Sequence, residues 1–215
     1  MTNPNATFIG LLADRSWSMT TIKDAAEKGV DSFIDEQRNA EGTCRVSLVQ
    51  FDDQYDEDYL DMPVIEVPKF VLVPRGSTAL LDAMGRFITD TGKRLAKLPE
   101  SERPGTVIIA IVTDGKENAS TKWERPAIKA LVEQQTEKYG WKFLYMGANQ
   151  DAVEVGAGMG IAADYAVTFT PSNVDVVASM TSQNIVGYRG SVARGLADDS
   201  LLGYTEMQRR SALYR

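Results

Sequence analysis

Apolar runs of strand length alternate with amphipathic stretches of helix length along most of the chain. Residues 107–112 are apolar throughout, which is typical of a central strand covered on both faces. Residues 22–34 instead repeat apolar side chains on one helical face. The pattern predicts six strands, at about residues 7–13, 45–51, 59–67, 106–112, 141–146 and 165–169. It predicts helices at about residues 20–39, from 78 to shortly before Pro99, at 123–139, from 151, and a last one capped by Ser172.

Strands and helices in alternation predict an α/β fold with a doubly wound, mostly parallel central sheet and helices on both faces. The acidic run 52–58 separates two predicted strands by a short connection, which is expected to be a solvated hairpin tip. Because short connections favour antiparallel pairing, the strand at 59–67 is expected to lie antiparallel at an edge of the sheet.

A single domain is the natural expectation for 215 residues. The alternation of strands and helices loosens from Gly187 onward, where glycines recur and arginines make the sequence locally basic. We therefore predict one domain over residues 1–188 and a C-terminal extension over residues 189–215 that is not a separate domain.

Composition excludes several classes of function. The formal net charge of −7 disfavours binding to nucleic acids or to anionic membrane surfaces. The chain has no histidine, which rules out Ser-His-Asp and Cys-His catalysis and zinc sites of the Cys/His kind. The single cysteine, Cys44, is expected to be a small buried hydrophobe. The polar N-terminus and the lack of a long apolar run predict a cytoplasmic protein, or part of a particle assembled in a host cytoplasm.

Oxygen-bearing side chains gather where predicted strands end and predicted helices begin. They are Asp14, Ser16 and Ser18 after the first strand, Thr78 at the head of a helix, and Asp114 at the end of the central strand. Ligands of α/β sheets bind at the carboxyl ends of strands. Because hydroxyls and carboxylates without histidine or cysteine suit a hard divalent cation, the sequence predicts Mg²⁺ or Mn²⁺. The alternative is that these side chains only cap helices.

The three clusters read Asp14-x-Ser16-x-Ser18, Gly76-Ser77-Thr78 and Thr113-Asp114-Gly115, in this order. Together they resemble the metal-ion-dependent adhesion site (MIDAS) of the von Willebrand factor A (vWA) domain, and the resemblance covers about residues 5–188. The later part, including residues 147–152, is similar to bacterial and bacteriophage members. The resemblance implies a Rossmann-like fold with one antiparallel edge strand. It also implies a divalent cation held by Asp14, Ser16, Ser18, Thr78 and Asp114.

A site rich in neutral hydroxyls leaves part of the charge of a bound cation without compensation. The resemblance therefore implies a protein partner whose Asp or Glu carboxylate completes the coordination. Trp17, between the two serines, is either an exposed anchor for that partner or a ring packed against the neighbouring loop. Arg15, Ser77 and Lys116 are the other candidates for a partner-binding rim. Arg15, Lys116 and the following Glu117 are, however, better explained as solvated loop charges.

These observations predict a metal-dependent protein-binding module that is not an enzyme. An alternative is a structural or accessory component of a phage or bacterial assembly, in which the cation only stabilises the loops. A metal-dependent hydrolase has less support, because the chain offers no histidine and no spare carboxylate clearly placed as a general base.

Overall fold

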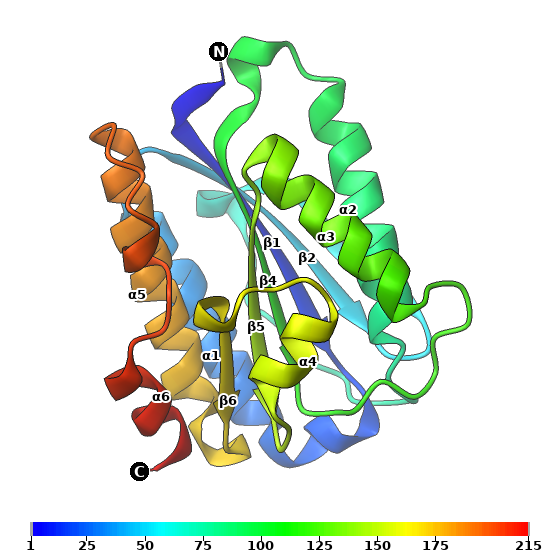
Figure 1. Cartoon of the computed structure of the whole chain (residues 1–215). Helices are drawn as coiled ribbons and strands as arrows, with labels where there is room; N and C mark the ends of the chain where they lie inside the picture. Colours follow the sequence, from blue (N-terminus) through cyan, green and yellow to red (C-terminus); the bar gives the residue numbers. More distant parts are fainter. Residues whose placement is uncertain (1, 215) are drawn as a thin grey trace.

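A six-stranded sheet forms the centre of the computed structural model, which describes residues 2–214 (Figure 1). The strands are β1 (Asn3–Asp14), β2 (Thr43–Phe51), β3 (Tyr55–Pro63), β4 (Pro104–Thr113), β5 (Lys142–Ala148) and β6 (Ala166–Phe169). They lie in the order β3-β2-β1-β4-β5-β6, and every neighbouring pair is parallel except β2 and β3. The predicted doubly wound, mostly parallel α/β fold with one antiparallel edge strand is confirmed.

Helices cover both faces of the sheet (Figure 1). One face carries α1 (Lys23–Asn39), α5 (Val174–Ala193) and α6 (Glu206–Leu213), and the other carries α2 (Leu80–Ala96), α3 (Arg125–Tyr139) and α4 (Ala152–Gly158). The 3₁₀ turns are η1 (Trp17–Ile22), η2 (Val64–Glu66), η3 (Glu100–Glu102), η4 (Ala163–Tyr165), η5 (Pro171–Asn173) and η6 (Asp199–Leu201). Within residues 2–214, no helix has the length and apolar character needed to cross a membrane.

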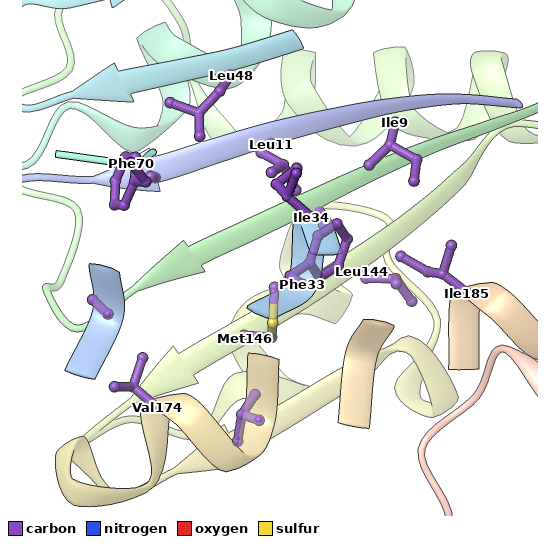
Figure 2. Close-up of a cluster of buried hydrophobic side chains, with 14 of the residues drawn as sticks. Ile9, Leu11, Phe33, Ile34, Leu48, Phe70, Leu144, Met146, Val174 and Ile185 are labelled. Atoms are coloured by element: carbon purple, nitrogen blue, oxygen red, sulfur yellow. The ribbon is translucent and has the colours of Figure 1, made fainter. Parts of the chain in front are cut away.

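Two hydrophobic cores lie between the sheet and the helices, and alternate residues of β1 belong to each. Ile9 and Leu11 face the core under α1 and α5, whereas Phe8 and Leu12 face the core under α2 and α3. Figure 2 shows the first core, where side chains of β1, β5, α1 and α5 meet. Burial of each such side chain contributes about 1.5–3 kcal/mol to folding, so β1 is held firmly from both sides. Its carboxyl end is therefore a fixed platform for the loop that follows.

Several element boundaries differ from the prediction, including the end of β3, which lies at Pro63 and not at residue 67. β3 begins at Tyr55, so most of the acidic run 52–58 belongs to an edge strand and not to the hairpin tip. α1 begins at Lys23, because residues 17–22 form the separate turn η1. α2 begins at Leu80, two residues later than expected. The hydrophobic pattern located the middle of each of these elements better than its ends.

Residues beyond 188 are built into the core under α1 and α5. α5 continues through the predicted boundary to Ala193, and the buried Arg189 within it donates hydrogen bonds to α1. Ala212 of α6 is also fully buried. Its carbonyl accepts a hydrogen bond from the amide of Thr170, directly after β6 (3.1 Å). The extension expected over residues 189–215 therefore begins, in the structure, inside a helix of the core.

The last long helix is not capped as predicted. Its N-cap is Asn173, and no side chain caps its first turn. The hydroxyl of Ser172 instead lies 3.2 Å from the hydroxyl of Thr170. The Asn173 side-chain amide donates to the carbonyl of Ala212 (3.1 Å). The residues before α5 hold α6 in place, which is a contact that local sequence does not indicate.

An extended segment, residues 67–75, runs along α1 and leads into the loop before α2. Phe70 and Leu72 bury their side chains, and their amides donate to the carboxylates of Asp31 and Glu27 on α1 (2.9 and 2.8 Å). These carboxylates, one helical turn apart, take the place of a neighbouring strand as hydrogen-bond acceptors. The segment is thereby guided to the carboxyl edge of the sheet.

Candidate metal centre

Three loops meet at the carboxyl edge of the sheet, beyond the central strands β1 and β4. The first site loop is residues 14–18, the second is residues 76–79, and the third is residues 113–120. Main-chain hydrogen bonds tie the second loop to each of the others, one donated by the amide of Trp17 (3.2 Å) and one by the amide of Asn118 (3.0 Å). The fold therefore brings together the three motifs that the sequence presents far apart.

Four of the five predicted ligands share one hydrogen-bond network. The Ser16 amide donates to Asp14 Oδ1 (2.6 Å), and the Thr113 hydroxyl donates to Asp14 Oδ2 (2.5 Å). The hydroxyl oxygens of Ser16 and Ser18 are 3.1 Å apart, and the Ser18 hydroxyl donates to Asp114 Oδ1 (2.6 Å). The network joins the ends of β1 and β4 directly.

Thr78, the fifth predicted ligand, faces the same point as Asp14 and Ser16. A Cβ atom placed on Gly115 would lie 2.6 Å from Thr78 Oγ1, 3.3 Å from Asp14 Oδ2 and 3.4 Å from Ser16 Oγ. These three oxygens therefore surround a small space that any side chain at position 115 would enter. The close approach explains why a glycine follows Asp114.

Burial makes the carboxylates of this site costly to ionise. Asp14 is fully buried, and this burial raises its pKa to about 6, although hydrogen bonds from neighbouring hydroxyl and amide groups offset part of the effect. Burial also raises the pKa of Asp114. Ser16 and Thr78 are buried, whereas Ser18 is exposed. The site thus has a buried floor and an open side.

The donor chemistry fits a hard divalent cation. Neither Asp14 nor Asp114 forms an ion pair with another side chain among residues 2–214, so these carboxylates lack a positive partner within that part of the chain. No group of three or more His, Cys, Asp or Glu side chains in the same range could hold a metal by itself. The oxygens at this site are mainly hydroxyls, which suit Mg²⁺ or Mn²⁺ together with water.

The structure argues against helix capping as the role of these residues. Ser16 is the N-cap of η1, yet its side chain makes no capping hydrogen bond. The N-cap of α2 is Ala79, so the hydroxyl of Thr78 does not cap that helix either. The Ser16 side chain points into the hydrogen-bond network and the Thr78 hydroxyl faces the space beside Gly115, and neither caps a helix.

Three residues that support the site were missed by sequence reasoning. Thr113 donates to a predicted ligand, as described above. The Asn118 side chain accepts from the amide of Thr78 (2.9 Å), and Glu117 accepts from the amide of Leu81 in the first turn of α2 (2.9 Å). Glu117 is therefore a structural acceptor and not a solvated loop charge. Thr113 lies inside a motif that could have indicated it, whereas the other two bonds join residues far apart in sequence.

Three of the four residues predicted for the partner-binding rim are exposed. Trp17 is 69% exposed, which favours the exposed ring over one packed against the loop, and Ser77 and Lys116 are exposed too. Arg15 is a correction, because it is only 5% exposed. Its guanidinium forms an ion pair with Asp56 (2.7 Å) and is neither a solvated charge nor part of an open rim.

Comparison of the sequence with protein-family models and with curated proteins gives no match. Solved structures, by contrast, resemble the chain in fold. One is proximal thread matrix protein 1 from the mussel byssus with a zinc-occupied MIDAS motif, at 15% identity and a TM-score of 0.55. Others are the pilus adhesin SpaC from Lactobacillus rhamnosus GG in its open conformation (14%, TM-score 0.62) and a von Willebrand factor type A structure from Catenulispora acidiphila (16%, TM-score 0.52).

These matches cover 89%, 86% and 91% of the chain, in the order given, but 47%, 30% and 43% of the other proteins. The chain thus spans less than half the length of each structure it matches. At these identities the likeness establishes the fold. The chain has the vWA fold, as the resemblance of its three motifs implied.

Proposed function

We propose that this chain, which has the vWA fold, is a metal-dependent protein-binding module. In this proposal a divalent cation, Mg²⁺ or Mn²⁺, is held by Asp14, Ser16, Ser18, Thr78 and Asp114, and a carboxylate of a partner protein completes its coordination. The observation that carries the proposal is the convergence of three oxygens, from Asp14, Ser16 and Thr78, on the space beside Gly115. The loop after β1 and the loop before α2 supply those oxygens and the loop after β4 supplies Gly115, a convergence that chance placement of caps does not explain.

The hydrogen bonds of the site support this assignment. The Ser18 hydroxyl donates a hydrogen bond to Asp114, which orients the Ser18 oxygen. One lone pair of that oxygen accepts from the Ser16 hydroxyl, and the other stays available. Thr113 likewise holds one oxygen of Asp14 in position. When bound, the cation supplies positive charge that two carboxylates and neutral hydroxyls compensate only in part, and an incoming Asp or Glu is attracted to it.

The exposed surface around the site suits a protein partner. Trp17 places a large aromatic ring beside the open side of the site, and buried aromatic rings often dominate the binding energy of interfaces. The exposed Lys116 adds a positive charge that would favour an acidic partner. We therefore include Trp17, Ser77 and Lys116 in the proposed partner-binding rim.

Partner capture is favoured over a purely structural ion. Direct main-chain hydrogen bonds, from Trp17 and Asn118 to the second loop, join the site loops to one another, so their connection does not pass through the proposed cation. We also propose binding without catalytic turnover, because the chain has no histidine and both oxygens of Asp14 already accept hydrogen bonds. The cytoplasmic location stays a prediction, since similar structures come from a pilus and a byssus.

Calorimetric titration of metal-free protein with Mg²⁺ and Mn²⁺ tests the metal site. We expect one saturable site in the wild type and loss of binding in Thr78→Ala and Asp114→Ala. Binding that is unchanged in both variants would contradict the assignment. Ser172→Ala is a matched control, because its hydroxyl lies outside the site network and, among residues 2–214, hydrogen-bonds only to the hydroxyl of Thr170.

Tryptophan fluorescence tests carboxylate capture. Peptides that differ only in one Asp or Asn are added to protein in Mg²⁺ or in chelator. We expect the tryptophan fluorescence to change when Asp peptides are added in Mg²⁺ but not in chelator. This change should be lost in Trp17→Phe, which leaves the other two tryptophans in place. Equal responses to Asp and Asn peptides would contradict carboxylate capture while leaving the metal site intact.

A further inference from the structure

We propose that Arg15, Asp52 and Arg75 form a clasp that positions Thr78 for metal binding, although none of the three is a ligand. The inference rests on the proposed metal site and extends it to residues on the far side of the second loop. Asp52 lies directly after β2 and is fully buried, contrary to the solvated hairpin tip expected from the sequence.

The side chains of the clasp converge on one carboxylate. Asp52 Oδ2 lies 2.7 Å from Arg75 Nε and 3.4 Å from Arg15 Nε. Asp52 Oδ1 accepts from the amide of Gln54 (2.6 Å), which fixes the carboxylate in the hairpin turn. Asp56 lies within 2.7 Å of Arg15 and 3.2 Å of Arg75 and bridges the two guanidinium groups from the outside.

Main-chain hydrogen bonds connect the same segments as the side chains of the clasp. The amide of Arg75 donates to the carbonyl of Arg15 (2.8 Å), and the amide of Ala79 donates to the carbonyl of Asp52 (2.9 Å). These two bonds lie on either side of Thr78, one at each end of the second site loop. The loop is thus attached to β1 at its start and to the end of β2 at its finish.

Gly76 shows how closely the second loop is drawn to the clasp. Its φ of +67° is one that residues with a side chain rarely adopt. A Cβ atom there would lie 2.5 Å from Asp53 Oδ1 and 3.1 Å from Asp52 Oδ2. A glycine at this position is needed for the loop to pass the carboxylates and to present Thr78 to the site.

Charge alone does not explain why two arginines stand beside a cation site. Positive charges near a bound cation weaken its binding, so a purely electrostatic role predicts tighter binding when Arg75 is neutralised. A positioning role predicts the opposite, because the second loop and its Thr78 hydroxyl lose their support. The sign of the change in affinity therefore separates the two explanations.

Titration of metal-free protein with Mg²⁺ tests the clasp, with Arg75→Gln and Asp52→Asn beside the wild type. We expect both variants to bind Mg²⁺ about tenfold more weakly or worse, the size seen when residues that orient metal ligands are removed. Arg75 is partly exposed, so Arg75→Gln is expected to fold even if Asp52→Asn does not. Unchanged or tighter binding in Arg75→Gln overturns the inference.

Arg189→Gln is the matched control. It also removes a positive charge, from an arginine that is more buried than Arg75, but its partners lie in and just after α1, away from the site loops. We expect it to lower the melting temperature and to leave Mg²⁺ affinity unchanged. A loss of affinity equal to that of the clasp variants would show that general destabilisation, and not positioning, is the cause, and would overturn the inference.

Hydrogen exchange in the metal-free proteins separates the clasp from the metal site itself. The amide of Ala79 donates to the carbonyl of Asp52, and the amide of Trp17 donates to the carbonyl of Gly76. We expect both amides to exchange faster in Arg75→Gln than in the wild type or in Arg189→Gln. A wild type that binds no Mg²⁺ refutes the proposed function. Exchange that is unchanged in Arg75→Gln refutes the clasp, whatever the outcome of the metal titration.

Discussion

Two equally buried arginines show how differently two regions of the molecule are built. Arg15, 5% exposed, is held by carboxylates of the hairpin turn and β3 and belongs to the loop region, meaning the three site loops and the clasp. Arg189, 4% exposed, belongs to the helix region, meaning α1, α5, α6 and the core beneath them. It donates to the side chain of Gln37 (2.8 Å) and to the carbonyl of Glu41 (3.1 Å).

The difference shows what each region is organised to do. In the helix region, apolar burial dominates and a buried arginine is held by neutral acceptors of α1 and of the turn after it, while burial lowers its pKa. In the loop region, opposite charges and glycines place hydroxyl oxygens around one small space. We therefore expect substitutions in the helix region to change stability without changing metal binding, and substitutions in the loop region to change metal binding.

The largest expected effect on stability is in the helix region. Phe33→Ala removes a buried ring from the core shown in Figure 2 and should lower the free energy of unfolding by about 3–5 kcal/mol. Denaturant unfolding in the presence of chelator measures this loss. Mg²⁺ affinity, measured below the melting transition, should stay that of the wild type. Mg²⁺ affinity that falls together with stability would contradict the expected independence of the two regions.

The next effect is a pH dependence that belongs to the loop region. The pKa of Asp14 is about 6 in the folded protein and 3.8 in the unfolded chain, so the folded state binds more protons between these values. The stability of the metal-free protein should therefore fall as pH rises from about 4 to about 6, by up to about 3 kcal/mol for a shift of this size.

Denaturant unfolding at several pH values, in chelator, checks this sign. Asp14→Asn should remove most of the fall, because asparagine carries no proton to lose. Phe33→Ala should lower the whole curve without changing its slope. A wild-type curve and an Asp14→Asn curve that stay parallel would show that Asp14 does not titrate in this range.

Binding of Mg²⁺ should raise the free energy of unfolding by an amount similar to the pH effect of Asp14. At a Mg²⁺ concentration 100 times the dissociation constant, linkage raises the free energy of unfolding by about 2.7 kcal/mol. Gly115→Ala should abolish this gain, because its Cβ would enter the space shared by Thr78 and Asp14.

Gly187→Ala is the matched control in the helix region. Its nearest neighbour would be the Cβ of Leu201, at 3.9 Å, so the added methyl group has room. Melting curves with and without Mg²⁺ should show the same gain in this variant as in the wild type. A gain that persists in Gly115→Ala would place the cation elsewhere.

The smallest effect on stability is expected at the rim. Trp17→Ala removes an exposed side chain and should change the free energy of unfolding by no more than about 0.5 kcal/mol. It should nevertheless abolish the binding response to Asp peptides, measured as the heat of binding in a calorimetric titration. Leu196→Ala, at an exposed position after α5, is the control and should leave that response intact. An undiminished response in Trp17→Ala would remove the ring from the partner-binding rim.

Much of this molecule was predictable because the relevant signals are local. The apolar run 107–112 and the alternation of strands and helices indicate a parallel, doubly wound sheet, since each element carries its own periodicity. The five proposed ligands stand out in the sequence because each lies at the end of a strand or the start of a helix. In such sheets the ends of central strands come together, so local position indicates shared location.

The remaining features depend on contacts between distant residues. No local period indicates that Arg15 pairs with Asp52, that Asn118 holds Thr78, or that the residues after 188 complete the core under α1 and α5. Charged residues in loops look solvated in a sequence, because only the folded chain shows which opposite charge lies beside them. The tertiary structure alone decides which charges are buried in pairs, and here those pairs set the geometry of the site.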